Sequence, residues 1–143
     1  MPDFDPSAWE EQLIADLRAH GTPSQGPLKG HPLLVLYATG AKTGERRRCL
    51  LTFTRDGEDY IVAGTANGSP KTPSWVINIR AKPNVNVEVG NQTFDATGTV
   101  VDDRPERDRL WDQHVARLPW FGDYPAKTQG RLIPVIRLTP NAQ

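Results

Sequence analysis

From Leu33 onward the sequence consists of short apolar and β-branched segments separated by tight turns, and this succession limits the possible folds more than any other feature. Asp56-Gly57 and Gly90-Asn91 are turn signals of the kind that join two strands in a hairpin. Consecutive hairpins build an antiparallel sheet, because parallel strands need long crossover connections and no regular strand–helix alternation is present. In one small domain such a sheet hides its edges most easily by closing into a barrel. We therefore predict a mainly β fold, an antiparallel barrel with flanking helices.

The pattern predicts about six strands and three helices. We expect strands at residues 33–39, 47–55, 60–65, 84–89, 92–101 and 132–138, and two helices at 74–81 and 105–118. The third helix lies at the N-terminus, where Asp5 can cap it and Pro6 fits its first position. Trp9, Leu13 and Leu17 then recur every four residues, as on one face of a helix.

The segment between the first helix and the first strand has the composition of a linker. Residues 22–32 include three prolines and two glycines. We therefore expect two parts, an N-terminal helix with its linker (residues 1–31) as an appendage, and a barrel domain (residues 32–143).

Composition excludes several classes of function. The 143 residues are enough for one domain, and 17 basic residues balance 17 acidic ones, so net charge gives no reason to expect a nucleic-acid partner. One cysteine excludes an internal disulfide framework, and three histidines far apart in sequence give no metal-ligand spacing. No apolar run approaches the roughly 20 residues of a membrane span, and the acidic N-terminal segment, residues 1–5, is unlike a signal peptide. We expect a cytoplasmic protein without an integral membrane segment, and peripheral attachment to a membrane stays open.

The most basic segment lies at the turn of the first hairpin. Two glycines bracket Lys42 and Thr43, so this turn can expose backbone N–H groups to an anion. Side chains alternate along a strand, so Arg46 and Arg48 share one face while Arg47 takes the other. A Walker loop is excluded because Ala41, and not a glycine, directly precedes Lys42. An anion site and a solvated, charged hairpin end both fit these residues.

Two further segments are candidates for ligand contacts. Residues 64–75 are mostly small and lead into a helix, where they permit close approach of a flat ligand, although Trp75 also fits a core anchor. Trp120, Phe121 and Tyr124 lie among prolines and a glycine, as at the mouth of an apolar pocket or over one end of the barrel. The sequence contains no conventional combination of catalytic residues. We interpret Cys49 as a small, buried hydrophobic residue. Any chemistry is then most simply that of a bound cofactor.

Several of these segments together resemble the deazaflavin-dependent nitroreductase family, which are actinobacterial split β-barrel reductases with the FMN-binding-like fold. The stretches that carry the resemblance are residues 39–47, 55–57, 73–79, 81–84 and 133–135, with consistent spacing from about 32 to 140. The resemblance implies a split barrel that is usually a homodimer and that uses coenzyme F420, an 8-hydroxy-5-deazaflavin. It also makes residues 32–143 the cofactor-binding domain.

The resemblance also implies a set of site residues. Lys42 and Arg47 match the family's contacts to the anionic oligoglutamate tail, and Trp120, Phe121 and Tyr124 correspond to its substrate segment. The cofactor-binding residues implied in this way are Lys42, Thr43, Arg47, Arg48, Cys49, Leu50, Leu51, Thr52, Ala63, Gly64, Thr65, Ala66, Ser74, Trp75 and Asn78. Two cations common in the family are replaced by Ala41 and Ala66, and the sequence leaves open whether neighbouring arginines offset them.

The implied reaction is hydride transfer from C5 of the reduced deazaflavin to an activated double bond of a planar, apolar acceptor. Enones, quinones and coumarin-type lactones are the expected acceptors. Nitro compounds are expected to react weakly, because Thr52 stands where a tyrosine occurs in the nitro-reducing branch. The proton donor is water or the hydroxyl of Thr65 or Tyr124, and the sequence does not choose among them.

Three alternatives remain at this point. An FMN-dependent oxidoreductase on the same barrel needs no long basic track, because FMN carries one phosphate and no glutamate tail. A non-catalytic deazaflavin carrier predicts binding without turnover. A nucleic-acid module that uses the basic hairpin is disfavoured by the zero net charge.

Overall fold

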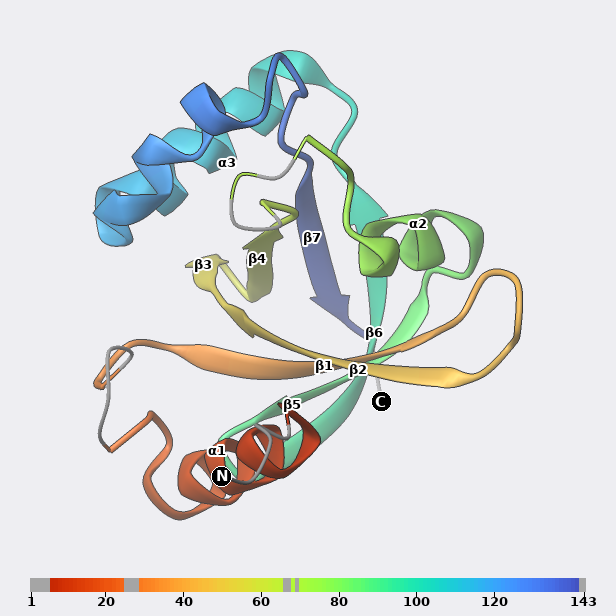
Figure 1. The fold of residues 1–143 in the computed structure, drawn as a ribbon, viewed down its shortest axis with the longest axis vertical. Helices are drawn as coiled ribbons and strands as arrows, with labels where there is room; N and C mark the ends of the chain where they lie inside the picture. Colours follow the sequence, from red (N-terminus) through yellow and green to blue (C-terminus); the bar gives the residue numbers. More distant parts are fainter. Residues whose placement is uncertain (1–5, 25–28, 66–67, 69, 142–143) are drawn as a thin grey trace, which may run out of the picture.

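Seven strands form one antiparallel sheet in the computed structural model, which describes all residues except 1–5, 25–28, 66–67, 69 and 142–143 (Figure 1). The strands are β1 (Leu33–Thr39), β2 (Arg46–Thr52), β3 (Thr54–Asp56), β4 (Asp59–Ala63), β5 (Asn84–Val89), β6 (Gln92–Val100) and β7 (Val135–Pro140). Their order across the sheet is β2-β1-β5-β6-β7-β4-β3. The sheet curls into a half-barrel, so the predicted split β-barrel fold is confirmed.

Helices flank this sheet. They are α1 (Pro6–His20), α2 (Ser74–Ala81), α3 (Arg104–Arg117) and the short 3-10 helices η2 (Pro119–Asp123) and η3 (Pro125–Lys127). The side chain of Asp103 accepts a hydrogen bond from Glu106 N and so caps α3. No helix in the described part of the chain is both long and apolar enough to cross a membrane.

The prediction of about six strands is wrong at one place. Residues 47–55 were expected to form a single strand, but the chain leaves one strand and enters another around Phe53. Its first part pairs with β1 and its last part pairs with β4, which lies near the other end of the strand order. One continuous strand cannot serve both partners, because they lie at opposite ends of the open sheet.

Other boundaries agree closely with the prediction. The helix at 74–81 and the strand at 84–89 are confirmed, and the helix expected at 105–118 runs one residue earlier at each end. The last strand begins at Val135 rather than at Leu132. Pro134 lies just before it and cannot donate to a ladder, but its carbonyl accepts a hydrogen bond from Gly64 N at 2.9 Å.

The core divides between the two faces of the curled sheet. Val76 and Ile79 of α2 pack inside the half-barrel against Leu36 and other buried strand residues. Leu110 of α3 and Phe121 of η2 form a second cluster with β4 and the start of β7. The two clusters hold α2 and η2 in place on either side of the groove described below.

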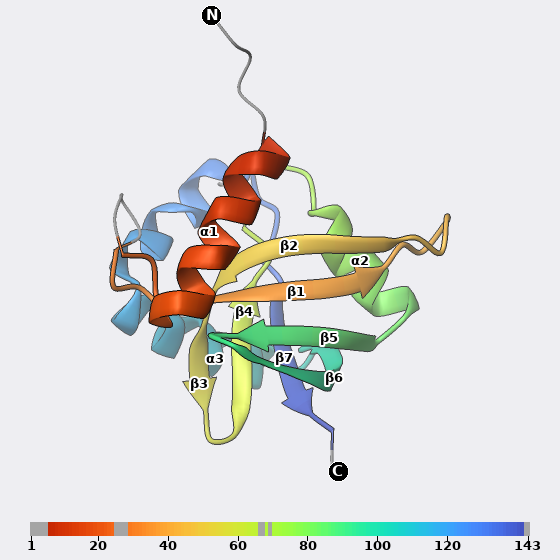
Figure 2. The same ribbon diagram turned by 90° about the horizontal axis from the view of Figure 1, so that it is seen from below.

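The N-terminal helix is part of the folded body and not an appendage. Ile14 and Leu17 are buried against Leu33 and Val35 of β1, and Figure 2 shows α1 lying beside this sheet. The periodic stripe therefore does form a core contact, but only through its C-terminal half. Trp9, at the other end of the stripe, is 49% exposed.

A bidentate ion pair fixes α1 to the sheet. Arg18 Nε and Nη2 donate to the two carboxylate oxygens of Glu88 at 2.6 and 2.9 Å, and Glu88 itself is only 6% exposed. The Arg18 hydrogen bonds hold the pKa of the Glu88 carboxyl below its usual range, against the opposing effect of burial. The pair therefore stabilises the buried carboxylate and the helix together.

Replacing Arg18 by Met should lower the free energy of unfolding by about 1–3 kcal/mol, because it leaves the buried Glu88 carboxylate short of donors. Amide hydrogen exchange in α1 should accelerate more than exchange in α3. Arg80→Met is the matched control, since Arg80 pairs with the exposed Asp102 and such a pair is worth under about 1 kcal/mol. Equal losses in the two variants would contradict this anchoring role.

Candidate active site

A continuous groove runs along β2. It consists of two pockets of about 630 Å³ and about 530 Å³, volumes that suit small-molecule ligands. Arg48, Cys49 and Trp75 line both pockets, so the two adjoin. Segments far apart in the sequence meet here, because α1, β2, α2 and η2 all contribute walls.

The backbone of β2 is part of the groove wall, because this strand lies at the open edge of the sheet. Phe53 N donates to Pro32 O at 3.2 Å across the end of the β1–β2 ladder, so this pair is a bonded one. Bonded and non-bonded pairs alternate in an antiparallel ladder. The backbone N–H and C=O groups of Arg48, Leu50 and Thr52 therefore face away from β1, on the open edge.

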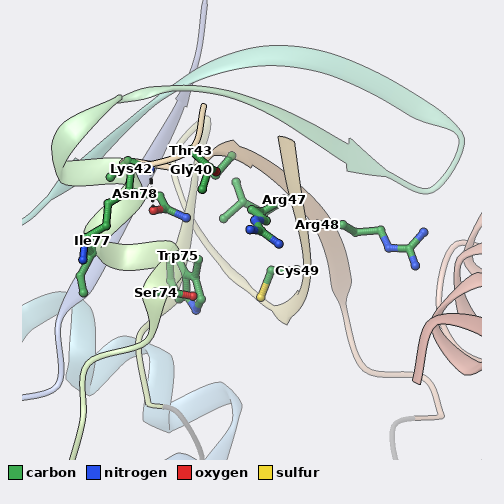
Figure 3. A pocket seen from close by; sticks show the side chains of 13 residues that line it. Gly40, Lys42, Thr43, Arg47, Arg48, Cys49, Ser74, Trp75, Ile77 and Asn78 are labelled. Atoms are coloured by element: carbon green, nitrogen blue, oxygen red, sulfur yellow. Dashed lines mark hydrogen bonds between the residues drawn. The ribbon is translucent and has the colours of Figure 1, made fainter. Parts of the chain in front are cut away.

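The first pocket, termed the basic pocket, lies between the 40–44 turn and α2 (Figure 3). Lys42 and Arg47 contribute exposed cations to its lining. Ala41 N donates a 3.0 Å hydrogen bond to the Oδ1 of buried Asn78, which holds the turn against α2. The turn predicted to bind an anion is thus fixed in position at one end of the groove.

Neighbouring arginines of β2 point in different directions, as the alternation predicts. Figure 3 shows Arg48 extending away from the side chains of Arg47 and Trp75. Arg47 pairs with Glu45 at 3.2 Å, whereas Arg48 Nε lies 3.8 Å from a carboxylate oxygen of Glu10 on α1. Arg48 also lines the basic pocket, but its guanidinium group extends toward α1 rather than toward the 40–44 turn.

The second pocket, termed the aromatic pocket, lies between α1, β2 and η2. Its apolar walls include Trp9, Leu13, Leu50, Trp120 and Tyr124. Polar groups among its described lining residues are few, and these apolar side chains exclude water from most of the wall. The pocket suits a flat, apolar ligand.

Two of the three aromatic rings in residues 120–124 are presented to the pocket, as the sequence predicts, and the third is mostly buried. Trp120 and Tyr124 are half-buried and line the aromatic pocket, but Phe121 is 6% exposed and belongs to the second core cluster. Phe121 contacts Tyr124 edge to face at a centroid distance of 5.4 Å. It acts mainly as a support for the ring beside it.

His114 supports the aromatic segment from behind. Its ring is fully buried, lies 4.6 Å from Phe121 in an edge-to-face arrangement, and shares a 2.8 Å hydrogen bond with Thr54 Oγ1 through Nδ1. Among the described residues, Nε2 has no hydrogen-bond partner. Burial lowers the pKa of His114 to about 4, so the imidazole is neutral at physiological pH.

The end of β4 is fixed by an arginine. Arg131 donates to the carbonyl oxygens of Gly64 and Thr65 at 3.0 and 2.9 Å. Thr65 lines the aromatic pocket, whereas Gly64 is packed so closely against Pro134 and Val76 that an added Cβ would lie 2.8 Å from each. Gly64 thus has a packing role in the described structure.

The thiol of Cys49 lies at the junction of the two pockets and is half-buried, not fully buried as predicted. Burial raises its pKa to about 12, so the thiol stays protonated at physiological pH. A protonated thiol is a poor nucleophile. Cys49 therefore contributes shape and apolar surface to the groove.

The structure brings most of the predicted site residues together in this groove. Predicted residues that line it are Lys42, Thr43, Arg47, Arg48, Cys49, Leu50, Leu51, Thr52, Ala63, Thr65, Ser74, Trp75, Asn78, Trp120, Phe121 and Tyr124. Gly64 does not line it, and Ala66 lies outside the described residues. The sequence analysis missed Trp9, Glu10 and Leu13 of α1. A signal was present, because Trp9 and Leu13 extend the apolar stripe beyond the part that the core needs.

The curled antiparallel sheet and the groove along its open edge define a split-barrel protein whose groove has cations at one end and aromatic rings at the other. The family model described as F420H(2)-dependent quinone reductase matches residues 11–140. The chain belongs to this family and is an F420-dependent oxidoreductase. Family membership gives coenzyme F420 as its cofactor and lends no support to FMN.

Individual relatives agree with this assignment. The chain is 36% identical over 151 aligned positions to an F420H(2)-dependent quinone reductase of Mycobacterium tuberculosis, with 95% of this chain and 99% of the relative covered. A solved structure described as an F420-H2 dependent reductase is 33% identical, with a TM-score of 0.67 over 75% of this chain and 93% of that one. Another, described as a domain-swapped dimer, is 32% identical, with a TM-score of 0.69 over 94% and 99%.

Stability should fall with acidification between about pH 6.5 and pH 4 through His114, because the unfolded imidazole takes up a proton that the folded one refuses. The full effect of this shift is roughly 3 kcal/mol. His114→Gln removes the titration while keeping a hydrogen-bonding side chain, so its pH slope in urea unfolding should be flatter. A wild-type slope in His114→Gln would show that this imidazole does not carry the effect.

Proposed function

We propose that this protein binds reduced coenzyme F420 along the open edge of β2 and reduces a planar, apolar acceptor with an activated double bond, quinones first among them. The observation that carries the proposal is the groove itself, with cations at one end and aromatic rings at the other. Enones and coumarin-type lactones share the flat, conjugated shape and are included. Nitro compounds are weaker candidates, because Thr52 offers only a small hydroxyl at its place in the aromatic pocket.

The residues of the groove fit the cofactor in three respects. Lys42 and Arg47 suit an anionic glutamate tail, since charge-assisted hydrogen bonds to carboxylates are strong. Thr43 and Ser74 add hydroxyls to the same pocket. The unpaired backbone edge of β2 offers alternating donors and acceptors to a ring with polar edges. Trp75, which lines both pockets, offers a flat apolar surface between them.

The chain's contribution to the reaction is positioning. When bound, reduced F420 supplies a hydride from C5 of its deazaflavin ring. The aromatic pocket holds the acceptor and excludes water. Cys49 and Trp75, at the junction of the two pockets, set how closely the acceptor can approach the cofactor. Thr65 and Tyr124 both line the aromatic pocket, and their hydroxyls are the protein's candidate proton donors beside water.

We also propose that the protein is a homodimer, supported by the domain-swapped dimer described for a structure 32% identical to this chain. A cytoplasmic location stays part of the proposal. Size-exclusion chromatography with light scattering would test the oligomeric state directly.

The decisive test is a titration of the purified protein with reduced F420 and with FMN, followed by a panel of quinones, enones, lactones and nitroimidazoles. Selective F420 binding with quinone turnover supports the proposal. Equal or tighter binding of FMN contradicts the cofactor assignment, and tight F420 binding without turnover of any acceptor indicates the carrier alternative.

We expect the basic pocket to bind the glutamate tail of the cofactor. Lys42→Ala and Arg47→Ala should each weaken F420 binding by about 1.5–3 kcal/mol where the contact is well formed, because each removes a charge-assisted hydrogen bond. The loss should shrink for a cofactor without glutamates, and high salt should weaken binding of the tailed form. Fluorescence titration measures both. Arg104→Ala, exposed on α3, is the control, and an equal loss with the tail-less cofactor would refute the assignment.

The aromatic pocket should set acceptor affinity. Trp120→Ala should raise the quinone KM by roughly threefold to tenfold and leave the F420 Kd nearly unchanged, because it removes ring contacts with the acceptor only. Trp120 is a better choice than Phe121, whose truncation would also open the core beside His114. Steady-state kinetics with several quinones provide the measurement, and unchanged KM values for all of them would exclude Trp120 from the acceptor site.

A further inference from the structure

Arg48 stands apart from the other cations of the groove. The aromatic pocket is lined by sixteen described residues, and Arg48 and Glu10 are the charged ones among them. Their side chains are 27% and 28% exposed, and the Arg48 Nε lies 3.8 Å from a Glu10 carboxylate oxygen. An ion pair in an otherwise apolar, aromatic pocket is costly to desolvate unless a ligand uses it.

Arg48 lines both pockets, but its guanidinium group extends toward α1 and so reaches the aromatic pocket. Its neighbour Arg47 lies on the other face of the strand, beside the basic pocket. Among the described residues, Glu10 is the only ion-pair partner of Arg48, and the approach at Nε is 3.8 Å, longer than a hydrogen bond. The two terminal nitrogens of the guanidinium group therefore keep donors for a second partner.

Quinone reduction creates an anion for which such a donor is suited. Hydride transfer to one quinone oxygen would break the C5–H bond of reduced F420 and form an O–H bond, and the displaced π electrons would pass through the ring to the other oxygen. The immediate product is a hydroquinone monoanion, with negative charge on one oxygen, and reduced F420 becomes oxidised F420. A proton from water then completes the hydroquinone. A guanidinium group within a low-dielectric pocket stabilises the developing charge before that proton arrives.

We infer that Arg48 is a catalytic residue that binds the acceptor oxygen on which negative charge develops, and that the Glu10 carboxylate on α1 tempers the positive charge of its guanidinium group. This inference rests on the proposed function, because it assigns a role within the same acceptor pocket. With this role, the N-terminal helix contributes to the chemistry of the site as well as to the packing of the core. This role also separates Arg48 from Lys42 and Arg47, which face the anionic tail.

Binding of an anionic quinone tests the inference without cofactor. The probes are 2-hydroxy-1,4-naphthoquinone, an anion at neutral pH, and its neutral methyl ether, and quenching of tryptophan fluorescence reports their Kd values. The preference for the anion should fall by roughly tenfold or more in Arg48→Met, the fold-change of one charge-assisted hydrogen bond, and only partly in Arg48→Lys. Arg46→Met is the matched control. Arg46 lies on the same face of β2 but outside both pockets, over the Tyr37 ring at 4.4 Å.

The Glu10→Gln variant distinguishes an effect on anion binding from simple misfolding. Removing the carboxylate relieves its repulsion of the anion, so the preference for the anionic probe should rise, a gain that loss of folding cannot produce. An unchanged preference in Arg48→Met, or an equal fall in Arg46→Met, would overturn the inference.

Turnover with reduced F420 separates this inference from the proposed function. Arg48→Met should lower kcat for neutral quinones by roughly tenfold or more with a smaller change in KM, because the charge exists mainly in the transition state. Normal turnover in Arg48→Met would overturn the role of Arg48 and leave the reductase function standing. Absence of quinone turnover in the wild type would overturn the proposed function, and the fluorescence titration would still decide which residue holds the anionic probe.

Discussion

The one-sided pairing of β2 is the constraint on which the rest of the structure depends. This strand pairs with β1 along one edge, and around Phe53 the chain passes on to β3, which pairs with β4 near the other end of the sheet. The sheet therefore curls without closing between its two end strands. The open edge leaves space for a groove, and the elements that flank it, α1, α2 and η2, become its walls. A fully closed barrel of the same strands would have no such groove.

Adjacent residues of β2 reach chemically different parts of the groove. Arg47 and Arg48 are adjacent in sequence, yet one faces the basic pocket and the other reaches toward α1. A strand achieves this separation over one residue step, whereas a helix would place neighbouring residues about 100° apart on one surface. The proposed recognition of an anionic tail and of an apolar acceptor would thus use the same short segment. Cys49 lies between the arginines, contacts both pockets and stays uncharged.

Local chemistry in the sequence predicts the parts of the fold that depend on neighbours in the chain. The helix at 74–81 and the strand at 84–89 follow from periodicity and from Pro83, which cannot continue a helix. The break at Phe53 could not be predicted, because β-type periodicity continues across it and only the partners differ. The proposed cofactor residues come from the family's motifs, but the wall formed by Trp9 and Glu10 depends on how α1 docks, which Arg18 and Glu88 decide across seventy residues of sequence.

An open edge strand is a hazard, because its unpaired backbone groups can pair with another chain. Three consecutive arginines on β2 oppose such pairing by charge, and α1 and α2 form walls of the groove that runs along this strand. The same arginines are available to ligands, so protection of the edge and recognition at the edge use one set of side chains. A flat ligand with polar edges would also satisfy the outward N–H and C=O groups of Leu50 that the sheet leaves unpaired. The unpaired backbone groups that expose this edge to other chains are therefore the same groups with which a bound cofactor would form hydrogen bonds.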